Sequence, residues 1–271
     1  MKCQICQSNL RPIFHKKVMF KYEVDYYSCD NCKFVQIIEP HWLEEAYSNA
    51  ITSTDIGLVA RNLYFSQIVE RIILKFFNNN GVFLDYGSGY GLFVRIMRDK
   101  GLNFYGEDKY CDNLFSQIFD KNNLETNTKF ELITAFEVFE HLENPMSIID
   151  YFINISDNIL FSTELQPNDN IENWHYISPE NGQHISFFHH KTLLKISSIL
   201  NMQLHTNGSS LHLLTKKKYN FDIIKSMEKS KNIFTRLFYK IGNIFDNQNV
   251  KTNKSLLMQD WELIKNIQKN K

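Results

Sequence analysis

Residues that could bind a nucleotide gather in one short stretch, Val82–Gly91, which reads VFLDYGSGYG. An apolar run ends in an acid, glycines follow at alternate positions, and an apolar helical pattern comes next. This order predicts a strand, a tight turn and a helix whose free N–H groups point at the ligand. Glycine suits such a turn because its backbone adopts positive φ and lets a ligand approach closely. The predicted cofactor-binding residues here are Asp85, Gly87, Ser88, Gly89 and Gly91.

The spacing of the glycines distinguishes two classes of cofactor. A dinucleotide turn has its third glycine three places after the second, whereas here Leu92 stands at that place. The spacing therefore argues against an NAD-dependent dehydrogenase. Asp108 ends the next expected strand 19 residues after Gly89, which matches the acid that binds ribose hydroxyls in nucleotide-binding βαβ units. Glu107 is the alternative for that task, and a purely structural turn is the alternative for the glycines alone.

Four cysteines form two Cys-x-x-Cys pairs near the start of the chain. Cys3 and Cys6 are separated from Cys29 and Cys32 by 22 residues, which is typical of a zinc ribbon. Two disulfides or four unrelated thiols are the alternatives. The beginning of the chain is not a secretory signal, so we expect a cytoplasmic, reducing environment that disfavours disulfides. The sequence predicts a structural Zn²⁺ that folds residues 1–39, because four thiolates leave no open position for chemistry.

The apolar patterns predict a doubly wound α/β sheet over residues 40–216. A long amphipathic helix from Asp55 to Phe77 precedes the first strand, and its Arg61 is expected to close over the cofactor, with a solvated face as the alternative. Later segments are assigned by the same periodicities. Strands are expected at 130–135 and 158–163, helices at 111–120, 145–155 and 190–201, and an antiparallel pair around the turn Asn207-Gly208.

The D-x-G-x-G-x-G form of the glycine stretch resembles motif I of class I S-adenosylmethionine-dependent methyltransferases. With the cysteine pairs, FEVFEHLENP at 136–145 and WHYISPENGQHISFF at 174–188, residues 1–216 resemble bacterial methyltransferases of sugar and cell-surface glycan biosynthesis, such as that of capsule polysaccharide. The ubiquinone-type O-methyltransferases are similar more distantly. The resemblance implies an S-adenosylmethionine cofactor held by Asp85, Gly87, Gly89 and Asp108, with Phe136 and Glu137 lining the site.

Methyl transfer from a sulfonium to a hydroxyl requires an in-line geometry and a general base. Histidine suits the task of a general base at neutral pH, and His184 is the first candidate. A purely structural role for His184 is an equally weighted alternative. Glu180 is expected to orient His184 or to bind a sugar hydroxyl. His141 is the second candidate base, and the alternative for it is a role in capping a helix or packing in the core. The expected substrate contacts are Trp174, His175 and Tyr176.

The likeness leaves several functions open. The expected acceptor is a small molecule, a sugar or a nucleotide sugar, methylated on oxygen. A sugar C-methyltransferase, an RNA methyltransferase that grips RNA through its ribbon, and a non-catalytic interaction module are the alternatives. The intact Asp85 and Asp108 argue against the module. A catalytic metal at Glu164, Asp169 and His175 matches no ligand spacing that we can defend.

Charge is spread unevenly along this chain, whose formal net charge is zero. Residues 216–271 carry 13 basic and 5 acidic residues, and the rest carries 17 and 25. The acidic body argues against nucleic acid as a partner. Residues 217–271 are predicted to form a basic helical tail, either packed on the body or serving as a homodimer or peripheral membrane contact. No apolar run approaches the roughly 18 residues of a transmembrane helix.

Overall fold

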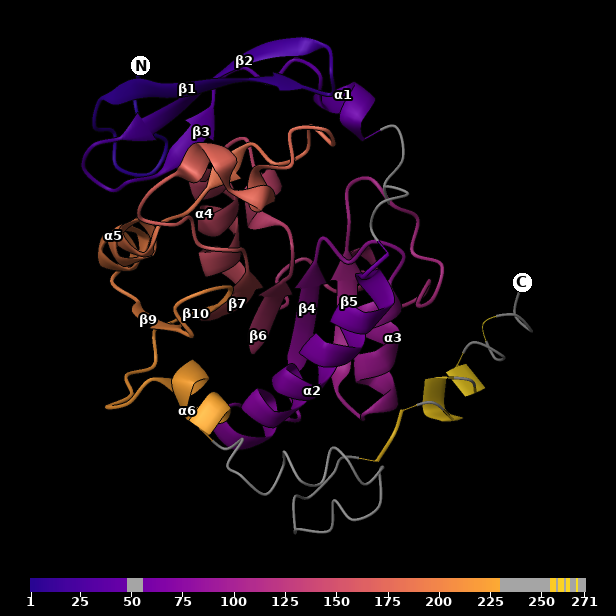
Figure 1. Cartoon of the computed structure of the whole chain (residues 1–271). Helices are drawn as coiled ribbons and strands as arrows, with labels where there is room; N and C mark the ends of the chain where they lie inside the picture. Colours follow the sequence, from indigo (N-terminus) through magenta and orange to yellow (C-terminus); the bar gives the residue numbers. More distant parts are fainter. Residues whose placement is uncertain (48–55, 230–253, 257, 261, 264–266, 268–271) are drawn as a thin grey trace, which may run out of the picture.

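The computed structural model describes residues 1–47, 56–229, 254–256, 258–260, 262–263 and 267. The described strands form two sheets (Figure 1). A four-stranded sheet holds the N-terminal strands and a six-stranded sheet holds the rest. In Figure 1 the small sheet lies across one end of the molecule, above the segment that follows β7.

The small sheet is antiparallel in the order β1-β2-β3-β8. Its first three strands surround the cysteine pairs, and the fourth comes from a segment far along the chain. The chain turns at 19–21, so that β1 and β2 pair as a hairpin. The bounds are β1 Leu10–Val18, β2 Tyr22–Cys29, β3 Val35–Ile37 and β8 Ser186–Phe187, followed after β3 by a short helix, α1 Leu43–Ala46.

The large sheet has the order β5-β4-β6-β7-β10-β9. The first four strands are parallel, and β10 runs antiparallel to both of its neighbours. This mixed sheet confirms the predicted α/β class. Its order reverses direction between β4 and β6, the place where open α/β sheets bind ligands. The bounds are β4 Val82–Tyr86, β5 Asn103–Glu107, β6 Leu132–Ala135, β7 Asn158–Ser162, β9 Gln203–Thr206 and β10 Leu211–Thr215.

Helices cover both faces of this sheet, because its strands are apolar on both sides. Adjacent residues of β4 show the division: Phe83 packs with the helices α2, α3 and α6, whereas Leu84 packs with α4 and α5. The helices predicted before β4, after β6 and before β9 are confirmed. The bounds are α2 Leu58–Phe76, α3 Leu92–Asp99, α4 Pro145–Ile155, α5 His190–Leu200 and α6 Ile223–Lys229.

The helix predicted at 111–120 is wrong, since the chain forms turns there. A local side chain and a distant backbone carbonyl supply the hydrogen bonds that a helix would have made. Asn113 Oδ1 accepts from the N–H of Ser116, and the carbonyl of Tyr90 accepts from the N–H groups of Leu114 and Phe115. Short polar side chains compete with helix formation in this way.

The C-terminal part is described only in pieces. The predicted helical pattern Phe221–Phe245 begins with α6, and its remainder lies outside the described residues. The dimer or membrane contact predicted for the tail falls largely on the same undescribed positions. Asp260 is buried and forms ion pairs with Arg95 and Arg98 of α3, which places this part of the tail on the body. Of the helices described, none is both long and apolar enough to cross a membrane.

Candidate active site

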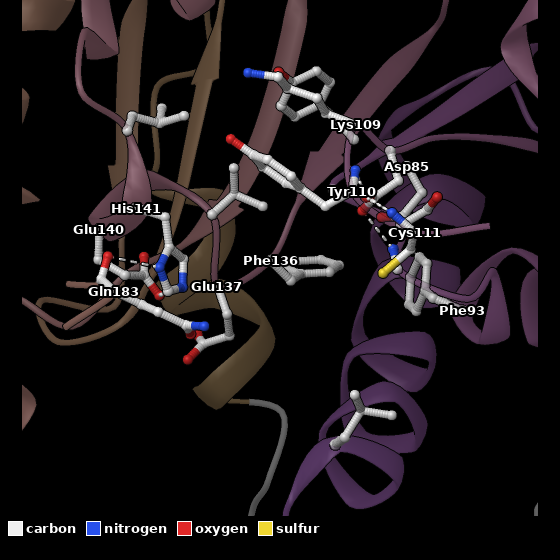
Figure 2. A pocket seen from close by; sticks show the side chains of 18 of the residues that line it. Asp85, Phe93, Lys109, Tyr110, Cys111, Phe136, Glu137, Glu140, His141 and Gln183 are labelled. Carbon is white, nitrogen blue, oxygen red and sulfur yellow. Dashed lines mark hydrogen bonds and ion pairs between the residues drawn. The ribbon is translucent and has the colours of Figure 1, made fainter. Parts of the chain in front are cut away.

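A cavity of about 650 Å³ lies at the carboxyl ends of β4, β5 and β6. The turns after these three strands line it, together with the N-terminal half of α2 and the loop before β8. Figure 2 shows Asp85, Tyr110 and Cys111 on one side of the Phe136 ring and Glu140, His141 and Gln183 on the other. The sequence-predicted residues that line the cavity are Arg61, Asp85, Gly87, Ser88, Gly89, Asp108, Phe136, Glu137, His141 and His184.

The glycine turn needs its glycines for two different reasons. Gly87 has φ 71°, and a Cβ there would come within 2.5 Å of Val138 Cγ2. Gly89 has φ 55°, and a Cβ there would meet no atom within 4 Å. The first glycine permits close packing of the turn on the segment after β6, and the second leaves room for a ligand at the cavity wall. Gly91 starts α3 with φ 82° and does not line the cavity.

Asp108 ties the glycine turn to the segment after β5. Its Oδ2 accepts a hydrogen bond of 2.8 Å from the N–H of Gly89, and its Oδ1 accepts from Tyr110 and Cys111 at 2.8 Å. A carboxylate has about four acceptor positions, so Oδ2 keeps one for a ligand hydroxyl. Glu107, the alternative, turns away from the cavity and accepts from the Tyr151 hydroxyl at 2.6 Å.

Asp85 is the buried acid at the end of β4. Its Oδ1 accepts from the Thr134 hydroxyl at 2.7 Å. The pKa of Asp85 is raised to about 7, mainly by burial and less by the nearby Asp108 carboxylate, while the Thr134 hydrogen bond acts in the opposite direction. A positively charged ligand beside this carboxyl would favour its ionised form.

Aromatic rings form the middle of the cavity wall. Phe136 stacks on Phe65 of α2 with ring centroids 4.2 Å apart, and Tyr47 stacks on Tyr110 with centroids 4.9 Å apart. Sequence reasoning missed the two tyrosines. Tyr110 follows Asp108 closely and was visible as an aromatic residue beside the predicted ribose acid, whereas no local pattern singles out Tyr47.

Two glutamates lie at the inner end of the cavity. Glu137 has φ 54°, a left-handed conformation that is uncommon for a residue with a side chain and is often found at functional sites. Burial, and then the neighbouring Glu140, raise the pKa of Glu137 to about 7. Burial also raises the pKa of Glu140, whose side chain has no exposed surface. Sequence reasoning missed Glu140, although its position beside His141 was a signal.

The two candidate bases lie side by side. The ring centroids of His141 and His184 are 4.9 Å apart. His141 Nδ1 lies 3.0 Å from the carbonyl of Gln183, and His184 Nδ1 lies 2.5 Å from that of Tyr176. Since a carbonyl only accepts, each Nδ1 carries the hydrogen, so Nε2 is the atom that offers a lone pair when the ring is neutral. Burial lowers the pKa of His141 to about 3, which keeps its ring neutral.

Besides Gly91, four predicted residues lie outside the cavity lining. Trp174 Nε1 donates to Glu164 at 3.1 Å, and His175 is exposed and pairs with the same carboxylate at 3.2 Å. The ring of Tyr176 packs at a tilt against that of His184, with centroids 4.6 Å apart, and does not line the cavity. Glu180 is exposed and accepts from the Ser178 hydroxyl at 3.2 Å. The loop before β8 therefore reaches the cavity through Ser178, Asn181, Gln183 and His184 instead.

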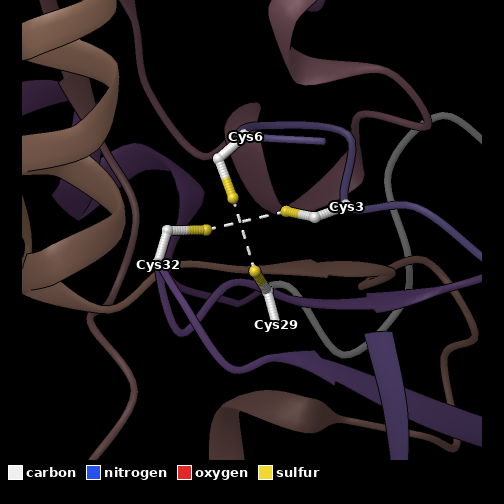
Figure 3. Close-up of side chains that lie close together, drawn as sticks. All are labelled: Cys3, Cys6, Cys29 and Cys32. Atoms are coloured by element: carbon white, nitrogen blue, oxygen red, sulfur yellow. Dashed lines mark hydrogen bonds between the residues drawn. The ribbon is translucent and has the colours of Figure 1, made fainter. Parts of the chain in front are cut away.

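The four cysteines converge in the small sheet. Their sulfur atoms point at a common centre (Figure 3). The Sγ atoms of Cys3 and Cys32 are 3.6 Å apart, those of Cys6 and Cys29 are 3.4 Å apart, and all four lie within 4.8 Å of one another. Tetrahedral zinc with Zn–S bonds of about 2.3 Å separates its sulfurs by roughly 3.8 Å. The cluster is thus compatible with a zinc ribbon.

The family follows from the match of residues 60–203 to the model of the methyltransferase domain. This span runs from α2 to β9 and holds most of the cavity lining. The chain belongs to the methyltransferase domain family. Membership agrees with the sheet order and with the glycine turn at its switch point.

Solved structures similar to this methyltransferase are distant. The plantazolicin methyltransferase, solved with a substrate analogue and SAH (S-adenosylhomocysteine), is 13% identical over 65% of this chain and 93% of that one, with a TM-score of 0.45. An O-methyltransferase family protein from Burkholderia thailandensis is 10% identical over 66% of this chain and 68% of that one, with a TM-score of 0.43. A search of the curated proteins found no match.

The cavity of this methyltransferase fits S-adenosylmethionine as the cofactor. The free acceptor position of Asp108 suits a ribose hydroxyl, and the open space at Gly89 lets the cofactor approach the backbone. The aromatic residues Phe93 and Phe136 are placed to cover apolar parts of the ligand. S-adenosylmethionine would supply a methyl group on a positively charged sulfur, which the acidic end of the cavity favours.

Proposed function

We propose that this chain is an S-adenosylmethionine-dependent O-methyltransferase that acts on a sugar, a nucleotide sugar or a surface-glycan precursor. The observation that carries the proposal is that one cavity holds both Asp108 with the glycine turn and His184 beside His141. One end is suited to the nucleoside, and the other offers imidazole lone pairs to a hydroxyl.

The lining of the cavity supports a hydroxyl-rich acceptor. The lining includes neutral amide and hydroxyl side chains, which both donate and accept hydrogen bonds. A sugar presents several hydroxyls that would pair with such groups, whereas a purely apolar acceptor would leave them unpaired when buried. These residues are Asn144, Ser147, Ser178, Asn181 and Gln183.

His184 is the proposed general base. In the neutral ring its Nε2 carries the lone pair, because Nδ1 donates its hydrogen to the carbonyl of Tyr176, and the Tyr176 ring packs against the imidazole at a tilt and holds it in place. The base would take the hydroxyl proton while the oxygen attacks the methyl carbon and the sulfur takes the bonding electrons. His141 lies next to it and is kept neutral by burial, so it adds no competing positive charge.

Zinc is proposed for the four cysteines. It would hold the two Cys-x-x-Cys turns of the small sheet together and would take no part in methyl transfer, because all four positions are filled by thiolates. The metal would therefore act structurally. Because β8 pairs with β3 of the same sheet and begins two residues after His184, the metal would also help to position the loop that carries His184.

The proposal is tested with radiolabelled S-adenosylmethionine and a panel of free sugars and nucleotide sugars. We expect methyl transfer to at least one of them. The variant His184→Ala should lose more than about 100-fold in kcat, within the range of general-base catalysis, and keep its affinity for SAH. His190→Ala, at an exposed histidine, is the matched control. Full turnover in His184→Ala would overturn the assignment of the base, and the absence of SAH binding to the wild type would overturn the function.

A further inference from the structure

Three side chains that commonly bind metals meet at the inner end of the cavity. Glu140, His141 and His184 each place one ligand atom within 4.8 Å of the others. They come from two distant segments, the turn after β6 and the loop before β8. No part of the cysteine cluster belongs to this group, so it is a second and separate set of donors.

The two imidazoles are oriented as metal-bound histidines are. Both donate Nδ1–H to backbone carbonyls, at 3.0 Å for His141 and 2.5 Å for His184. Metal-binding histidines usually donate their other ring N–H to a carbonyl or carboxylate, which fixes the tautomer. His141 Nε2 faces Glu140 Oε1 at 3.9 Å, a separation that leaves space between the two atoms for a bridging ion.

Glu140 supplies the second observation. Its side chain has no exposed surface, and neither carboxylate oxygen has a hydrogen-bond partner among the described residues. The hydroxyls of Thr163 and Tyr176 lie close enough to this carboxylate to lower its pKa, but neither completes a hydrogen bond of good geometry in the part of the chain that the structure describes. Glu137 adds a second, half-buried carboxyl in the same region, and it accepts a hydrogen bond from the Ser162 hydroxyl at 2.6 Å. Buried carboxylates are stable when they are paired or coordinate a metal, so the cluster has a place for a cation.

We propose that Glu140, His141 and His184 bind a divalent transition-metal ion whose remaining positions take oxygen atoms of the acceptor. Two imidazoles and one carboxylate favour Zn²⁺, Mn²⁺, Fe²⁺ or Co²⁺ over Mg²⁺ and Ca²⁺, which prefer oxygen donors. Three protein ligands leave positions open, as in catalytic metal sites.

This site rests on the proposed function for its role, since both share one cavity. A hydroxyl bound to such an ion releases its proton to solvent more readily, because the ion stabilises the alkoxide that remains. In the metal-bound enzyme His184 is therefore a ligand, and the ion takes over activation of the acceptor.

The test uses the full chain with its ribbon zinc retained and Mn²⁺ as the probe, because thiolate sites select zinc over manganese. Electron paramagnetic resonance of free Mn²⁺ measures binding. We expect one Mn²⁺ for each wild-type chain and at least a 10-fold loss of affinity in Glu140→Gln, His141→Ala and His184→Ala. His190→Ala should bind as the wild type does. The purified wild type could instead contain a second equivalent of zinc that His184→Ala lacks. That outcome would support the site equally, because it would mean that zinc already fills it.

Cofactor binding is measured in the same variants by calorimetry with SAH, which also reports that each variant is folded. A chain that binds SAH but takes up neither Mn²⁺ nor a second zinc overturns the metal site and leaves the proposed function standing. Equal Mn²⁺ binding in the wild type and all three variants overturns the site as well. A chain that binds Mn²⁺ at this cluster without binding SAH supports the site and overturns the proposed function.

Discussion

Gln36 of β3 and Ser186 of β8 are paired in the antiparallel small sheet. This pair joins the strand after the second cysteine pair to the loop that carries His184. The N–H of Ile37 donates to the carbonyl of Ile185 at 3.0 Å, and the Thr192 hydroxyl donates to the carbonyl of Cys32 at 2.8 Å. The cysteine cluster and the candidate active site are thus connected through a shared sheet.

Loss of the zinc proposed for the four cysteines should therefore impair methyl transfer more than cofactor binding. In Cys6→Ser the β3–β8 pairing is weakened, so we expect a higher KM for the acceptor and a lower melting temperature. The affinity for SAH should change less than about 3-fold, because the glycine turn belongs to the large sheet. Zinc content, calorimetry and acceptor kinetics on the same preparation check this. An unchanged KM in a variant that has lost its zinc would contradict the connection.

Asp108→Ala should weaken SAH binding by about 10- to 100-fold. The variant loses charge-assisted hydrogen bonds, each worth about 1.5–3 kcal/mol, to the glycine turn and to the ribose. Glu107→Gln is the matched control, because this side chain bonds to Tyr151 outside the cavity. Calorimetry with SAH should find Glu107→Gln within about 2-fold of the wild type. A stronger effect from Glu107→Gln than from Asp108→Ala would reverse the assignment of the ribose acid.

Stability should depend on pH through Asp85. Its pKa is about 7 in the folded chain against an ordinary value of 3.8, because burial disfavours the charge. The folded state thus binds the proton more tightly, so this contribution is complete below pH 4 and is lost as the pH rises to about 7. The slope is at most about 1.4 kcal/mol for each pH unit.

Urea unfolding of the ligand-free chain between pH 5 and pH 8 measures this dependence. Asp85→Asn should remove this pH dependence. The unfolding free energy of the wild type should therefore fall relative to that of the variant as the pH rises. A difference that is constant over this range would show that Asp85 does not titrate there.

Asp260→Ala should destabilise the chain by about 3–5 kcal/mol, because it leaves the buried Arg98 guanidinium without its carboxylate. Asp260 receives hydrogen bonds from Arg98 Nε at 3.0 Å and Nη2 at 2.9 Å, and both side chains are almost fully buried. Asp157→Ala is the control, since its exposed pair with Lys216 should contribute no more than about 1 kcal/mol. Unfolding free energies compare the two. Equal effects would mean that the tail segment does not stabilise α3.

The amino-acid sequence alone predicted the features that depend on local spacing. Alternate glycines after an apolar run define the turn at Val82–Gly91, and the distance to Asp108 follows from one strand–helix–strand repeat. The cysteine pairs are equally local, because each lies in its own tight turn. Such features are set by backbone geometry over a few residues, so they are visible without the fold.

Only the tertiary structure decided which parts of the loop before β8 enter the cavity. Trp174 and Tyr176 pack with the small sheet, so that His184 faces the cavity and the three aromatic and imidazole side chains before it do not. It also brought Glu140 and His141 to His184, since contacts between distant segments depend on how the two sheets pack. The turns at 111–120 arose partly the same way, because the carbonyl of Tyr90 from the glycine turn, together with the local Asn113 side chain, replaced the bonds of a helix.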